Sequence, residues 1–251
     1  MPAPEVLRLA GTTALLLLVA VAAAIGARTG GVRDLVVAVV RGAAQLALVA
    51  AVIGWVFRHP GAVAPYLLVM VVVATATATR RIGHGRTLAP HVAAAVVSGA
   101  AVVVVVAVGT GEVPLDAPTL LPYAAQVIGG AMVAAALAGQ RLRDDVRDRW
   151  DEVEGWLALG AQPGQAVAPL ARRAAARALV PAVDQTRSAG LVTLPGAFVG
   201  LLLGGASPWQ AAELQVLVLA GMLAAEAVSA AVLVRLAGPV LAAARPRPGA
   251  P

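Results

Sequence analysis

Residues 140–163 read Gln140-Arg-Leu-Arg-Asp-Asp-Val-Arg-Asp-Arg-Trp150-Asp-Glu-Val-Glu154-Gly-Trp-Leu-Ala-Leu-Gly160-Ala161-Gln-Pro163. They begin the long polar segment, residues 140–187, of a 251-residue chain that is 60% hydrophobic and only 13% charged. Ordinary soluble domains have roughly 45–50% apolar and 25% charged residues. The composition therefore predicts an integral membrane protein whose spans lie on both sides of this segment.

Seven apolar stretches are candidate transmembrane helices, because a helix needs about 20 apolar residues to cross a bilayer. They are residues 6–27, 35–57, 64–79, 88–108, 120–139, 190–206 and 211–236. The first could also be a cleaved signal peptide, but Arg28 and Arg33 follow it, which favours a retained helix. We predict an all-α polytopic membrane protein with one transmembrane domain over residues 1–238 and a disordered Pro-rich tail over residues 239–251.

The arginine residues predict the orientation of these spans. With the N-terminus outside, the inside segments carry 16 of the 19 basic residues, and the outside segments carry only Arg8 and Arg58. This asymmetry is the one that the positive-inside rule describes. We therefore expect the C-terminus and residues 140–187 to face the cytoplasm of a multi-pass protein of the cell (inner) membrane.

The composition also excludes several chemistries. All 19 basic residues are arginine, so the lysine of a phosphate-binding P-loop is missing and ATP cannot be hydrolysed by that route. The absence of cysteine removes thiolate metal sites, and the three histidine residues do not share a ligand spacing. The net charge of +6 is explained by membrane topology, so we expect no nucleic-acid partner.

Apolar residues in the polar segment recur at helical spacing. They are Leu142, Val146, Trp150, Val153 and Leu157. We expect the fifth span to continue through them as an amphipathic helix, with Asp145 and Arg149 paired on its wetted face. Gly160 and Pro163 should end this helix, and a second helical piece should follow.

Within residues 154–163 an acidic residue is followed six positions later by Gly-Ala. This spacing resembles the cytoplasmic EAA-type coupling loop of ABC-transporter permeases, in which a short helix docks into a groove of a separate ATPase. The residues that match this role are Glu154, Leu159, Gly160, Ala161 and Pro163. The pattern alone fits an ordinary interfacial helix with a glycine C-cap equally well.

Further motifs extend the resemblance over residues 33–236. They are Arg41-Gly-Ala-Ala-Gln45-Leu46, Gly130-Ala131-Met132-Val133-Ala134, Leu159-Gly160-Ala161, Leu179-Val-Pro181-Ala-Val-Asp184-Gln185-Thr-Arg187, Gly190-Leu-Val-Thr-Leu-Pro195-Gly196, Gly200, Ser207-Pro208 and Gln215. In this order the chain resembles the FetB-type permeases, which include bacterial iron exporters and plant aluminium-tolerance permeases. The resemblance implies a non-enzymatic homodimer that exports metal cations with a cognate ATP-binding subunit, which holds the ATP and Mg²⁺.

Polar residues within the spans are candidates for a substrate path, because a charge at the centre of a membrane helix costs at least about 2.5–3.5 kcal/mol. Glu226 lies midway along residues 211–236 and is the strongest candidate for a cation-path or ion-pair residue; a carboxyl group that stays protonated is the alternative. The other candidates are Arg41, Gln45, Met132, Asp184 and Gln185. Met132 could instead pack in the core, and Asp184 could instead pair with Arg187.

Residues 190–206 form a short span that contains Pro195. Gly196, Gly200 and Gly204 recur at intervals of four, a pattern that lets two helix backbones approach closely. Short spans interrupted by Pro and Gly are also where transporters place broken helices that face the substrate.

Three functions fit these observations. The leading hypothesis is an ABC export permease whose coupling loop transmits the motion of its ATPase. A self-sufficient cation channel or proton-coupled carrier, with Glu226 relaying charge, is the second. The third is a membrane scaffold that recruits a partner through residues 140–187 and transports nothing.

Overall fold

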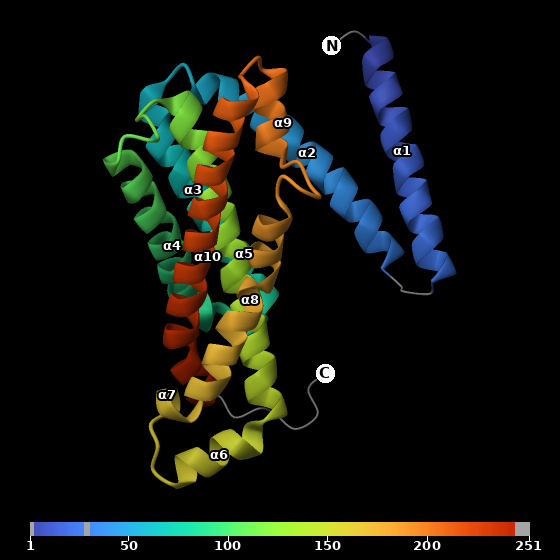
Figure 1. The fold of residues 1–251 in the computed structure, drawn as a ribbon. Helices are drawn as coiled ribbons and strands as arrows, with labels where there is room; N and C mark the ends of the chain where they lie inside the picture. Colours follow the sequence, from blue (N-terminus) through green and yellow to red (C-terminus); the bar gives the residue numbers. More distant parts are fainter. Residues whose placement is uncertain (1–2, 28–30, 244–251) are drawn as a thin grey trace. The chain divides into compact units, whose positions relative to one another are not determined.

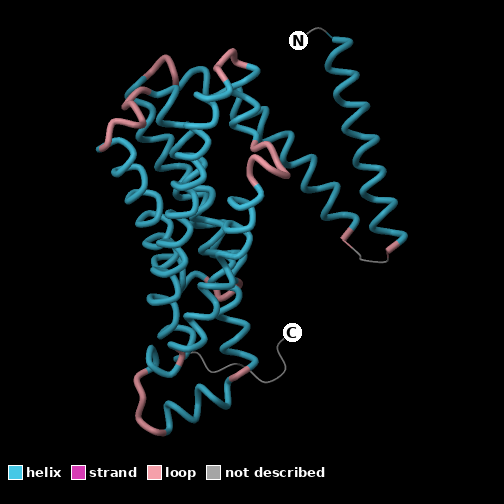
Figure 2. The backbone as a smooth tube through the Cα atoms, viewed as in Figure 1, coloured by secondary structure: helices cyan, strands magenta, loops and turns pink. Residues whose placement is uncertain are grey.

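The computed structural model describes residues 3–27 and 31–243, which are helical apart from short turns and one isolated bridge (Figures 1 and 2). The all-α prediction is therefore confirmed for the described residues. The chain forms two compact units, Met1–His59 and Pro60–Pro251, and each is described by itself. The predicted single domain over residues 1–238 stays a prediction.

The first unit is a helical hairpin of α1 (Ala3–Gly26) and α2 (Val32–Val56), which contact each other. Both helices are apolar over 20 residues or more, which is long enough to cross a membrane. Arg28, on which part of the orientation argument rests, lies outside the described residues.

The second unit is a bundle around α3 (Val63–Ile82), α4 (Ala89–Gly109), α5 (Ala117–Asp148) and α10 (Pro208–Ala243). These four helices are also apolar and long enough to span, so the described residues contain six candidate spans with α1 and α2. Helices α5 and α10 run parallel and α4 runs antiparallel to them (Figure 1). The chain is therefore a multi-pass membrane protein.

Small residues bring these helices into close contact. A Cβ atom on Gly99 of α4 would lie 2.5 Å from the carbonyl oxygen of Ala225, and one on Gly139 of α5 would overlap Ile82 and Leu233. The buried Ser229 hydroxyl donates a hydrogen bond of 2.9 Å to the Ala131 carbonyl. Helix backbones approach at such positions because no side chain separates them.

The seventh predicted span, residues 190–206, is not one helix. Its helical part is α9 (Gly196–Leu203), which at about 12 Å is too short to cross a bilayer. Before it, α8 (Ala168–Ser188) ends in a tight bend, where the Gly190 N–H donates to the Thr193 carbonyl and Gly190 adopts φ 85°. Pro195, directly before the first residue of α9, is extended with ψ 148°, so the helix does not continue through the bend.

The predicted start of the disordered tail, at residue 239, is too early. Helix α10 continues to Ala243 with Pro239 inside it, because Ala237, Leu241 and Ala242 are buried in the bundle. Tertiary packing of these apolar side chains compensates for the helix-breaking tendency of proline. The remainder of that prediction, residues 244–251, lies outside the described residues.

Candidate functional site

The coupling residues predicted from the sequence lie together at one end of the second unit. Helix α5 is followed by α6 (Trp150–Ala158), a turn, and α7 (Pro163–Ala166), which leads into α8 (Figure 1). Glu154 lies on α6, Pro163 begins α7, and the turn between them contains the others. We call residues 154–163 the tip. It contains all five predicted coupling residues: Glu154, Leu159, Gly160, Ala161 and Pro163.

The tip exposes apolar side chains. Leu159 is 82% exposed and Trp156 is 49% exposed, although both are large and hydrophobic. Gly160 adopts φ 88°, which a residue with a side chain rarely adopts, so it sets the reversal between α6 and α7. The Gln165 side chain accepts a hydrogen bond from the Gln162 backbone N–H and caps α7.

The base of the tip is anchored to the bundle. Val153, Ala166 and Val167 are buried, and Val167 packs against Gly238 of α10. The predicted apolar face is confirmed for Leu142, Val146 and Val153, which are buried, while Trp150 and Leu157 are partly buried and pack against the core. A motion imposed on the tip would therefore reach α5, α8 and α10.

Two details of this region differ from the prediction. The amphipathic helix is not continuous, because Arg149 leaves the helical conformation between α5 and α6. Asp145 does not pair with Arg149; it pairs with Arg177 of α8, while Arg149 lies 3.5 Å from Glu152. The fold places α8 beside α5, so the tertiary ion pair between Asp145 and Arg177 replaces the predicted pair between Asp145 and Arg149.

Glu226 is the most buried charged residue of the described chain, with 8% exposure. Its carboxyl group packs on Gly130 of α5, where a Cβ atom would lie 2.9 Å from its Oε1 atom. Among the described residues it has no ion-pair or hydrogen-bond partner. A carboxyl group between two spans without a partner is a candidate for cation or proton binding.

The other candidates for a substrate path do not gather around Glu226. Met132 is partly buried and packs against the apolar core, as its alternative interpretation predicts. Asp184 and Gln185 are exposed near the end of α8, and no ion pair joins Asp184 to Arg187 within the described residues. Arg41 and Gln45 are exposed on α2 in the first unit. The described residues contain no cluster of three metal-ligating side chains.

The three glycines of the predicted packing motif contact no other helix of the second unit. Gly196 and Gly200 have open space where a side chain would begin, and Gly204 meets only carbonyls of α9. Helix α9 is instead held by Gln215 of α10, whose buried side chain accepts a hydrogen bond of 3.2 Å from the Phe198 backbone N–H. Packing of these glycines against a second copy stays a prediction.

The sequence does contain a signal for the glycine contacts that were missed. Gly221, Ala225 and Ser229 recur at intervals of four along α10 and face the close approaches of α4 and α5. Ala225 and Ser229 meet Gly99 of α4, and Gly221 meets Val103 of α4 and Tyr123 of α5. The same spacing rule that selected residues 196–204 therefore also selects a face of α10 that packs against α4 and α5.

Comparison with known proteins adds the family. A profile described as an uncharacterised protein family (UPF0014) matches residues 7–240. The chain belongs to the UPF0014 family. It is 35% identical to the UPF0014 membrane protein STAR2 of Oryza sativa subsp. japonica, over 84% of this chain and 74% of that protein.

Bacterial members of the UPF0014 family are also similar. The chain is 30% identical to the UPF0014 membrane protein YjkA of Bacillus subtilis, over 85% of this chain and 86% of that protein. It is 30% identical to the probable iron export permease protein FetB of Escherichia coli, over 74% of this chain and 73% of that protein. These relatives confirm the resemblance found in the sequence. No solved structure matches the chain.

Proposed function

We propose that this UPF0014 protein is the permease subunit of an ABC transporter in the cytoplasmic membrane. A homodimer of the chain would export a metal cation, and a separate subunit would bind Mg²⁺ and hydrolyse ATP. The similarity to FetB, whose name describes a probable iron export permease, supports the substrate class and the direction. The architecture of the tip supports the mechanism.

The exposed tip is the observation that carries this proposal. Leu159 and Trp156 extend from the arginine-rich end of the bundle, where an exposed apolar patch is unfavourable unless a partner covers it. The tip is short and anchored on both sides, by Val153 and by Val167. A partner that binds it can therefore displace α5, α8 and α10 together.

Helices α8 and α9 supply the element that such a motion would act on. Val167 contacts Gly238 at one end of α10, and Phe198 bonds to Gln215, 23 residues and about 34 Å away along the helix. The segment from the start of α8 to α9 therefore covers about one bilayer thickness. The bend at residues 189–195 lies between the level of Gly238 and the level of Gln215. We interpret α8 and α9 as a broken seventh crossing.

The bend also supports the homodimer. Non-helical backbone at membrane depth is tolerated where protein buries it or where it lines a water-filled cavity. In the single chain the bend exposes Leu191 by 91% and Val192 by 82%. A second copy packed against α9 would cover these apolar side chains and leave the backbone groups facing an aqueous path for the cation.

Binding of the ATPase tests the proposal. We expect the tagged chain, purified from its native membrane in mild detergent, to bring a stoichiometric P-loop ATPase with it. Leu159→Asp should reduce the recovered ATPase at least about tenfold, because it places a charge in the apolar contact. Quantitative mass spectrometry of the two subunits measures the ratio.

Thr87→Asp is the matched control, because Thr87 is exposed on a turn of the second unit and lies far from the tip in sequence. The Thr87→Asp protein should bring down as much ATPase per chain as the wild-type protein does. Recovery of the chain alone, or an ATPase that stays bound to the Leu159→Asp protein, would contradict the docking surface. A bound ATPase without any cation flux would instead support the scaffold hypothesis.

A further inference from the structure

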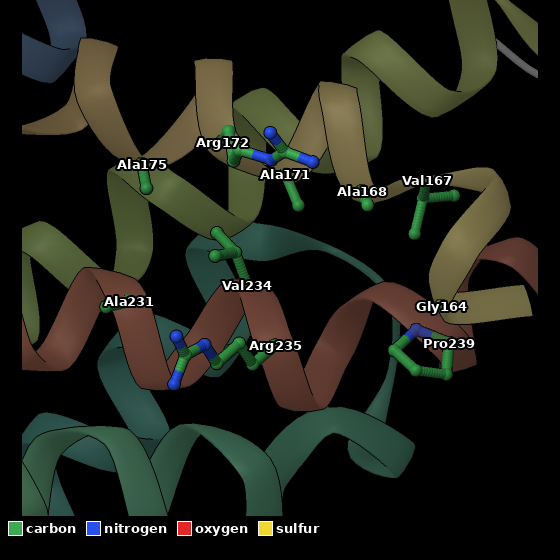
Figure 3. Close-up of a pocket in the computed structure, with 10 residues that line it drawn as sticks. All are labelled: Gly164, Val167, Ala168, Ala171, Arg172, Ala175, Ala231, Val234, Arg235 and Pro239. Atoms are coloured by element: carbon green, nitrogen blue, oxygen red, sulfur yellow. The ribbon is translucent and has the colours of Figure 1, made fainter.

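A cavity of about 460 Å³ lies between α8 and α10 near the base of the tip (Figure 3). Its α8 wall is formed by Ala168, Ala171, Arg172 and Ala175, and its α10 wall by Ala231, Val234, Arg235 and Pro239. Gly164 and Val167 close it toward α7. Apart from its two arginines, every residue that lines the cavity is apolar or glycine.

The two guanidinium groups come from opposite walls of this cavity (Figure 3). Neither Arg172 nor Arg235 has an ion-pair or hydrogen-bond partner among the described residues, and no acidic residue lines the cavity. The N-terminus of the 21-residue α8 also lies here, and no side chain caps it. Its backbone N–H groups and helix dipole add to the positive potential. The cavity is therefore suited to an anion.

The depth of the cavity places it at the level of lipid headgroups. Ile82 and Leu233 both contact Gly139, so they lie at one level of the bundle. Arg235 follows Leu233 by two residues and Arg81 directly precedes Ile82, so both arginines lie near this level. From Trp209 to Arg235, α10 rises about 39 Å, which exceeds the roughly 30 Å of hydrocarbon in a bilayer. Tryptophan is typical of membrane interfaces. With Trp209 at one interface, Arg235 lies just beyond the hydrocarbon at the other.

We propose that this cavity binds an anionic phospholipid from the leaflet on the arginine-rich side. The phosphate lies between Arg172 and Arg235, near the N-terminus of α8, and the upper part of an acyl chain packs on the small apolar residues of the walls. Basic pockets between spans at this depth recognise lipid headgroups in this way. The bound lipid joins α8 to α10 and so stabilises the helix that connects the tip to the bend.

Lipid binding to the purified full-length protein tests this site. In dodecyl maltoside, native mass spectrometry should detect retained dioleoyl-phosphatidylglycerol, and this lipid should raise the thermal midpoint more than dioleoyl-phosphatidylcholine does. Arg172→Gln with Arg235→Gln should weaken phosphatidylglycerol binding by roughly 30-fold, because two basic contacts to an anionic headgroup are lost. Arg81→Gln with Arg173→Gln removes the same charge outside the cavity and should leave binding within about threefold of wild type.

A second variant keeps both charges. Ala231→Trp fills the cavity from an exposed position on α10 and should also abolish retention of phosphatidylglycerol, even if the double arginine variant fails to fold. Equal binding by the cavity variants and the Arg81/Arg173 control would overturn the site. An equal thermal shift from inorganic phosphate at the same concentration would show a free-anion site and would overturn the lipid assignment.

Discussion

Replacing Gly99 with valine should strongly destabilise the bundle. A Cβ atom at this position would lie 2.5 Å from the Ala225 carbonyl oxygen and 3.1 Å from the Ser229 Cβ atom. Because the obstacle is helix backbone, a rotamer change cannot relieve the overlap, and α4 must move away from α10. Overpacking of this kind typically costs about 1–3 kcal/mol and occasionally more. We expect the apparent melting temperature to fall by about 10 °C or more.

Gly129→Val is the matched control for this prediction. Gly129 also lies inside an apolar helix, but a Cβ atom there meets no heavy atom within 4 Å. Its melting temperature should stay within about 3 °C of wild type, measured by fluorescence-detected size exclusion after heating. If both variants melt together with the wild-type protein, the close approach of α4 and α10 is not a principal contact of the bundle.

Replacing Glu226 with glutamine should reduce cation transport at least about tenfold while preserving the fold. Glutamine keeps the shape that packs on Gly130 and removes only the ionisable group. A carboxyl group buried between spans without a partner destabilises the fold, so its neutral replacement should leave the melting temperature unchanged or raise it. Transport into liposomes and thermal stability are measured on the same preparation.

Glu213→Gln provides the comparison, because Glu213 lies on the same helix but is exposed. It should retain transport within about twofold of wild type. If Glu226→Gln transports as well as wild type, Glu226 has a structural role only and the cation path lies elsewhere. A joint loss of stability and transport would also remove Glu226 from the path.

The six long helices were predictable because each contains a long, mostly apolar run, and the bilayer imposes helix on such a run. Residues 190–206 satisfied the same rule by composition. Their division into a bend and the eight-residue α9 depends on Pro195 and on the turn at Gly190, and only the structure shows that both interrupt the helix.

The tip was predictable because its elements are local. A reversal at Gly160, a helix that begins at Pro163 and a buried Val153 all follow from short-range spacing. Contacts between distant segments were not predictable in this way. Asp145 has Arg177 as its partner because α8 returns beside α5, and no single-helix pattern contains that information.

The helix-packing glycines show the same limit. A small-xxx-small pattern predicts that a helix face can approach another closely, but it does not say which pattern finds a partner within the chain. Gly221, Ala225 and Ser229 do so through α4 and α5, whereas Gly196 and Gly200 face open space. The arrangement of the whole bundle decides between them.

The most direct test of the proposed permease is cation transport by the purified chain in liposomes, with and without its co-purified ATPase. We measure uptake of ferrous iron into the liposomes under reducing conditions after adding ATP and Mg²⁺ outside them. The proposal predicts flux only when the ATPase and ATP are both present, and loss of that flux in the Leu159→Asp protein. Sustained iron flux through the chain alone would contradict it and would favour a self-sufficient channel or carrier.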